Sequence, residues 1–94
     1  MINAADARAN NRLARECEGL QAAINREICA AIDRGENKVE YFTQASRFAV
    51  ASTEQVLNAL GYDYRVIEAH RFVEEWYASR KNVTIVQAEF EIAW

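Results

Sequence analysis

The first third of the chain carries apolar residues at spacings of three and four positions, the period of an amphipathic α-helix. Asn3 suits an N-cap, and Gly35 suits the left-handed turn that often follows a helix, so the pattern predicts one long helix over residues 4–34. The apolar stripe of this helix comprises Leu13, Cys17, Leu20, Ile24, Ile28, Ala31 and Ile32.

After the first helix, apolar and polar residues alternate with a period of about two residues. Residues 38–43 alternate as in a β-strand, with Val39 and Tyr41 on one face and Phe42 on the other. A second helix covers at least residues 53–60. Ser52 and Gln55 have the spacing of a capping box, but residues 47–51 also fit a helix, so its start is left open; its exit turn falls at Gly61.

The last third of the chain indicates strands. Residues 62–68 and 83–94 read as strands, whereas residues 69–80 fit either a helix or a strand, and we favour a β-hairpin. The sequence therefore predicts an α+β fold in a single domain, residues 1–94. In it a long N-terminal helix, a strand, a second helix and a C-terminal β-hairpin form a small antiparallel sheet packed on the helices.

The length of the first helix bears on assembly. A helix of 31 residues is on the order of 46 Å long, whereas a compact domain of this size is roughly 30–35 Å across. The helix must overhang, break near Gly19 or pack against a second chain, and its apolar stripe favours a homo-oligomer. We also expect Phe90, Ile92 and Trp94 of the last strand to cover the inner faces of the helices, with Trp94 substantially buried.

Composition narrows the class of protein. The chain is 51% hydrophobic with a net charge of −3, typical of a folded domain and unlike a dedicated binder of phosphate backbones. It has no apolar run near 18 residues and no signal peptide, so we expect a cytosolic protein without a membrane partner. Cys17 and Cys29 form no CxxC pair and lie in one helical pattern, which disfavours a disulfide between them.

The arrangement resembles that of many small bacteriophage-encoded proteins of uncharacterised function. The likeness rests on Ile28, Ala31-Ile32 and Gly35 ("AI..G"), then Val39, then Leu60-Gly61-Tyr62 ("L..GY"), and finally Ile92 to Trp94 ("I.W"). It spans nearly the whole chain but involves core and turn positions. The resemblance therefore implies a fold, a phage origin and a location in the host cytoplasm, and it supplies no catalytic residue. This chain departs from the type in a longer stretch over residues 64–82.

No catalytic or metal-binding signature stands out. His70 is the only histidine and has no cysteine or histidine at ligand spacing, so a zinc site fails on ligand count. Cys17 and Cys29 sit on or near the apolar stripe, where cysteine behaves as a small hydrophobe. Glu89 and Glu91 point to one face of an edge or solvent-facing strand, where acidic residues ordinarily discourage sheet-edge pairing. We expect no enzyme activity, no cofactor and no metal.

Two groups of residues are candidates for binding. Arg8, Arg12 and Arg15 recur at helical spacing and either hold a phosphate or carboxylate or form a solvated face. The second group interleaves aromatic and basic residues, a composition that suits protein interfaces and nucleotide stacking but equally suits a core. It comprises Tyr64, Arg65, Arg71, Trp76, Tyr77, Arg80 and Lys81.

These observations predict a non-catalytic phage accessory protein that counters host defence. It would either inhibit a host defence protein or act as an oligomer that sequesters a small nucleotide signal, with self-association through the first helix, the C-terminal hairpin or both. A structural or assembly component of the virion is the alternative. A nucleic-acid-binding regulator acting through residues 62–81 is a second alternative, disfavoured by the acidic balance.

Overall fold

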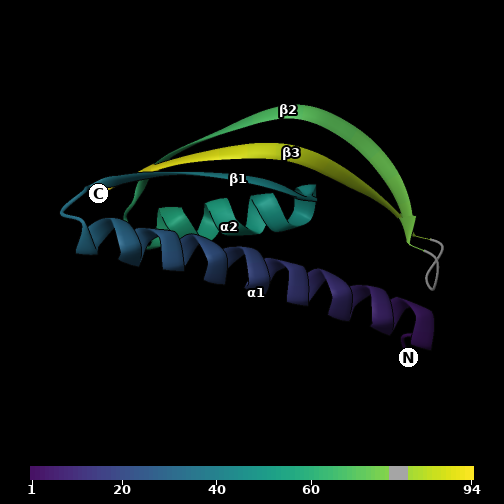
Figure 1. Cartoon of the computed structure of the whole chain (residues 1–94). Helices are drawn as coiled ribbons and strands as arrows, with labels where there is room; N and C mark the ends of the chain where they lie inside the picture. Colours follow the sequence, from purple (N-terminus) through teal and green to yellow (C-terminus); the bar gives the residue numbers. More distant parts are fainter. Residues whose placement is uncertain (77–80) are drawn as a thin grey trace.

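The computed structural model describes residues 1–76 and 81–94 and has an α+β fold. Its elements follow the order α1 (Ala4–Asp33), β1 (Lys38–Ser46), α2 (Arg47–Ala59), β2 (Asp63–Trp76) and β3 (Lys81–Ala93). Within the described residues, the three strands form one antiparallel sheet, which arches over the two helices (Figure 1). The predicted fold class is confirmed.

Both helices end in the same turn. At the end of α1 the N–H of Gly35 donates to the carbonyl of Ile32 and that of Glu36 to Ala31, and at the end of α2 Gly61 and Tyr62 repeat the pattern. This is the Schellman motif, which requires a left-handed residue after the helix. Gly35 and Gly61 supply it with φ angles of 75° and 83°, which an L-residue adopts at a cost.

Helix α2 begins earlier than the capping-box pattern predicts. Its N-cap is Ser46, whose hydroxyl accepts a hydrogen bond from the N–H of Ala49 at 3.1 Å, and not Ser52. The predicted strand accordingly runs three residues further, from Thr43 to Ser46. The Glu16 carboxylate of α1 accepts a hydrogen bond from the Ser46 N–H. A tertiary contact thus supports a helix start at which residues 47–51 are helical.

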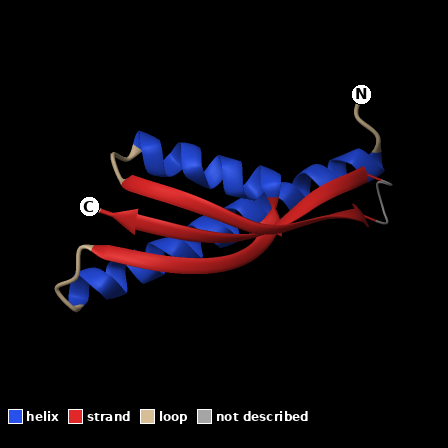
Figure 2. Cartoon of the chain, turned by 90° about the horizontal axis from the view of Figure 1, so that it is seen from above, coloured by secondary structure: helices blue, strands red, loops and turns tan. Residues whose placement is uncertain are grey.

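The strand order is β1-β3-β2, with β3 in the centre. Strands β1 and β2 are both antiparallel to β3 and hence parallel to each other, and α2 makes the crossover between them. This is a split β-α-β arrangement. Figures 1 and 2 show both helices on the same side of the sheet, so no helix of the described residues lies on its opposite face.

The ambiguous segment, residues 69–80, is a β-strand as far as Trp76, which confirms the favoured hairpin over its described part. A β-bulge lies between Glu68 and His70, where the pairing with β3 skips Ala69. A bulge inserts one residue and reverses the alternation of the faces. This explains why one strand period does not fit the whole segment.

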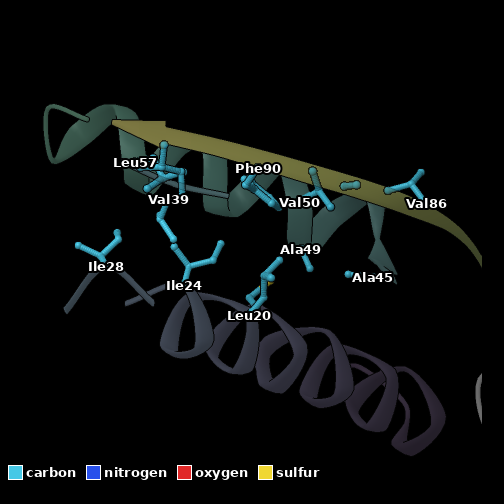
Figure 3. Packing of buried hydrophobic residues seen from close by; sticks show 13 residues of the cluster. Leu20, Ile24, Ile28, Val39, Ala45, Ala49, Val50, Leu57, Val86 and Phe90 are labelled. Atoms are coloured by element: carbon cyan, nitrogen blue, oxygen red, sulfur yellow. The ribbon is translucent and has the colours of Figure 1, made fainter. Parts of the chain in front are cut away.

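The main core lies between the helices and the inner face of the sheet (Figure 3). Phe90 and Ile92 are fully buried there, as predicted. Two expectations were wrong. Ile32 leaves the buried stripe and is 53% exposed, and Trp94 is 38% exposed. Trp94 is held by its main-chain N–H, which donates to the carbonyl of Asn37 at 3.0 Å, and by an edge-on contact with the ring of Tyr62.

Helix α1 is unbroken over its 30 residues, including Gly19, and is about 45 Å long. The molecule measures 47 × 27 × 19 Å, so this helix spans its long axis. The far end of the β2–β3 hairpin covers the N-terminal half of the helix, where Leu13 packs with Val83 and Ile85 in a separate apolar cluster. The hairpin thus accommodates the long helix within one chain, and the helix length alone no longer requires a homo-oligomer.

Candidate binding surface

The arginine row on α1 points into solvent. Arg8, Arg12 and Arg15 are all exposed and lie beside the buried stripe. Arg12 forms an ion pair with Glu74 of β2 at 3.7 Å, which ties the helix to the far end of the hairpin. Arg12 therefore holds α1 to β2, whereas Arg8 and Arg15 are exposed on the same helix.

The candidates on β2 point in different directions. Tyr64 packs against the core, whereas Arg65 lies on the outer face and reaches Glu91 at 3.8 Å. Arg71 bonds the carboxylate of Glu68 at 2.6 Å, and Arg47 of α2 contacts both oxygens of the same carboxylate. Charge-assisted bonds of this kind fix the start of α2 on β2. They leave Arg71 engaged within the fold.

The remaining candidates are described in part or not at all. Trp76 and Lys81 form the last pair of the ladder between β2 and β3, and only their main chains are described. Tyr77 and Arg80 lie outside the described residues. The sequence-based candidates that the structure does place do not converge on one pocket.

The uncovered outer face of the sheet gathers a different set of side chains. The strand register places them in rows of three across β1, β3 and β2. The rows are Lys38/Ala93/Asp63, Glu40/Glu91/Arg65, Phe42/Glu89/Ile67 and Gln44/Gln87/His70. We call these twelve residues the outer face.

Two large apolar side chains stand on the outer face. Phe42 is 69% exposed and Ile67 is 36% exposed, and they flank Glu89 in one row. They line a shallow depression of about 490 Å³ with Gln44 and Gln87. A second depression, of about 430 Å³, lies over the next rows toward Lys38 and Asp63. Exposed apolar surface bordered by polar residues is typical of a binding site.

The acidic residues of the outer face lie close together. Carboxylate oxygens of Glu40, Glu89 and Glu91 are all within 4.8 Å of one another, and Glu40 stands directly opposite Glu91 in the register. Like charges in this arrangement destabilise a sheet. Exposed carboxylates alone do not define a metal site, so we assign no ion to them. Glu89 and Glu91 share one face of β3, as predicted; of the two predicted settings, the solvent-facing strand applies, because β3 is the central strand.

Sequence reasoning missed most of the outer face. The alternation of residues 38–43 already placed Phe42 opposite Val39 and Tyr41, and Glu89 and Glu91 were assigned to one face. What the sequence lacks is the register that sets Phe42, Glu89 and Ile67 side by side. Segments 47 residues apart in the chain meet there, and no local pattern encodes that pairing.

An ion pair whose two groups have shifted pKa values lies at the turn between α1 and β1. The guanidinium of Arg34 donates to Glu36 at 3.1 and 3.3 Å. This hydrogen bond, with the attraction between the two charges, lowers the pKa of Glu36 and raises the pKa of Arg34. Both groups are exposed and lie on either side of Gly35 in the Schellman turn, so their pair bridges the change in chain direction.

Comparison with known proteins adds no relative. No family model, no curated protein and no solved structure matches the chain. Among the described residues, no helix is long and apolar enough to cross a membrane. Among the described surfaces, the outer face is therefore the strongest candidate for a binding site.

Proposed function

We propose that the protein is a non-catalytic, phage-encoded accessory protein that binds a host protein through the outer face of its sheet and thereby blocks it. The observation that carries the proposal is the pair of exposed side chains, Phe42 and Ile67, on a sheet face that no helix covers. The phage origin and the role against host defence rest on the resemblance of the sequence.

The outer face is preferred over other exposed apolar positions because of its extent. Phe48 borders a groove of about 330 Å³, and Val56 and Leu60 border one of about 60 Å³. The two depressions of the outer face, of about 490 and 430 Å³, share the central strand. A continuous surface on which exposed apolar side chains lie beside charged ones suits a protein partner.

Sequestration of a nucleotide finds less support. Such a site needs arginines and aromatic rings that converge on phosphate and base. Tyr64 faces the core, Arg65 faces outward and Arg71 is bonded to Glu68, so the described members of that segment face apart. The geometry supports the protein-binding form of the counter-defence role.

Co-purification tests the proposal. The tagged protein is expressed in a bacterial host beside two variants of similar chemistry, Phe42→Ser on the outer face and Phe48→Ser on α2, both at exposed positions. We expect the wild type and Phe48→Ser to retain the same host protein in a stoichiometric complex and Phe42→Ser to lose it. A complex retained equally by Phe42→Ser would refute the proposal.

Two further measurements separate the alternatives. A panel of cyclic nucleotides and ADP-ribose derivatives should leave the melting temperature unchanged. A ligand at one hundred times its Kd adds about 2.7 kcal/mol of stability and would raise the melting temperature of a small domain by about 10 °C or more. Mass spectrometry of purified phage particles should not detect the protein, because an accessory protein is not a virion component.

A further inference from the structure

The outer face carries an unequal set of charges. It holds the acidic residues Glu40, Asp63, Glu89 and Glu91 and the basic residues Lys38 and Arg65, four against two, a net charge of −2. On the central strand, Glu89 and Glu91 occupy successive outward positions about 7 Å apart, between Gln87 and Ala93. A partner for this face must therefore supply positive charge near its centre.

The structure leaves much of this negative charge uncompensated. Arg65 reaches Glu91 at 3.8 Å. Within the described ranges, no basic group lies at ion-pair distance from Glu40 or Glu89, although both belong to the cluster of carboxylates within 4.8 Å. Carboxylates that lie this close together can accept several N–H bonds from one planar cation. The cluster therefore offers acceptors at a spacing that suits a guanidinium group.

The apolar residues lie directly beside these acceptors. In the register, Glu89 has Phe42 on one side and Ile67 on the other. A guanidinium group bonded to Glu89 can lie over the Phe42 ring, where the cation is attracted to the π-face, whereas an ammonium group remains more strongly hydrated. Flanking apolar side chains of the same partner would cover Ile67 and the remainder of the ring.

We infer that the outer face recognises a protein segment that presents an arginine flanked by apolar side chains. The arginine binds the Glu40/Glu89/Glu91 carboxylates and the apolar neighbours cover Phe42 and Ile67. This inference rests on the proposed function and specifies the chemistry of the partner. It adds a requirement that the proposed function does not contain, namely that binding depends on charge.

A second copy of the chain does not fit this surface. Two outer faces stacked on each other would each bring a charge of −2. Like-charged surfaces disfavour association by several kcal/mol in a desolvated contact. The whole chain, at −3, carries the same sign.

The test uses fluorescein-labelled peptides in fluorescence anisotropy. The probe is a short peptide in which arginine alternates with leucine, and its controls replace every arginine by glutamate or every leucine by serine. The protein is measured as wild type, as the Glu40→Gln/Glu89→Gln double variant, as Phe42→Ser, and as two controls on the helices, Glu18→Gln and Phe48→Ser. Circular dichroism melting verifies that each variant folds.

We expect the arginine–leucine peptide to bind the wild type and both helix controls equally. Removal of two carboxylates should weaken binding by about tenfold, Phe42→Ser by at least as much, and both control peptides should bind more weakly than the probe. Binding should also weaken as salt rises. Equal affinity for the double variant, or no binding of the probe at millimolar protein, overturns the inference.

Two outcomes separate this inference from the proposed function. If a host protein requires Phe42 but binds the Glu40→Gln/Glu89→Gln variant unchanged, the outer face remains the binding surface and the arginine requirement is wrong. If light scattering shows that the wild type is a dimer and that Phe42→Ser is a monomer, a second copy of the chain occupies the outer face and the inference is overturned.

Discussion

Replacing Glu89 with glutamine should stabilise the fold. Glu89 lies in the middle of the outer face, and its carboxylate is within 4.8 Å of those of Glu40 and Glu91. Glutamine has nearly the same shape and removes the charge. The substitution therefore eliminates two repulsive pairs and leaves the packing beside Phe42 and Ile67 unchanged.

The magnitude follows from the distance. Two unit charges 4.8 Å apart repel by about 0.9 kcal/mol in bulk water and about 3.5 kcal/mol at an effective dielectric constant of 20. Glu40 is exposed, Glu89 and Glu91 are only partly covered, and Arg65 offsets part of the repulsion, so the smaller value applies. We expect Glu89→Gln to raise the free energy of unfolding by about 0.5–1 kcal/mol. The melting temperature should rise by about 2–8 °C.

Thermal unfolding followed by circular dichroism measures this effect. The gain should shrink in 1 M NaCl, where the screening length falls to about 3 Å. Glu18→Gln is the matched control, because Glu18 is an exposed carboxylate on α1 outside the cluster, and its substitution should change stability little. A melting temperature that falls or stays the same, or a gain that persists in 1 M NaCl, would refute the reasoning. A destabilising charge cluster kept on a surface is expected where binding requires it.

Three further predictions concern the fold. Leu13→Ala should lower the free energy of unfolding by about 2–3 kcal/mol, because it leaves a cavity in the cluster that holds the end of the hairpin to α1. Amide hydrogen exchange at Val83 should become faster, and exchange that stays slow would contradict this. Trp94→Ala should cost roughly 2 kcal/mol in urea unfolding, since the ring is partly exposed, and a loss above 4 kcal/mol would indicate deeper burial. The Arg34 guanidinium lowers the pKa of Glu36, so their pair stabilises the fold fully above the ordinary pKa of a glutamate and loses this effect as pH falls through the lowered pKa. Glu36→Gln should therefore melt below the wild type at pH 7, and the difference should narrow as the pH is lowered; a difference that does not change with pH would contradict this.

The sequence predicts the helices well because their signals are local. The apolar period of α1, the cap at Asn3 and the glycines at both Schellman turns lie within a few residues of the elements they define. The start of α2 stayed open in the sequence, because residues 47–51 fit a helix and Ser52 also suits a cap. The contact from Glu16, thirty positions away, favours Ser46.

The outer face could not be predicted because it depends on pairing between distant strands. A shift of one residue in register would bury Phe42 and expose Tyr41, and the sequence of β1 does not show which residue of β3 lies opposite. The bulge at Ala69 further obscured β2 by reversing its alternation. The aromatic and basic composition of residues 62–81 predicted one binding segment, but the fold directs Tyr64 and Arg65 to opposite faces of the sheet.

We propose that the outer face of the sheet binds a host protein. Isothermal titration calorimetry of the purified partner against wild type, Phe42→Ser and Phe48→Ser tests it most directly. We predict a Kd at least tenfold weaker for Phe42→Ser, because truncating a central aromatic anchor costs more than about 1.4 kcal/mol, and an unchanged Kd for Phe48→Ser. An unchanged Kd for Phe42→Ser, or a loss confined to Phe48→Ser, would contradict the claim.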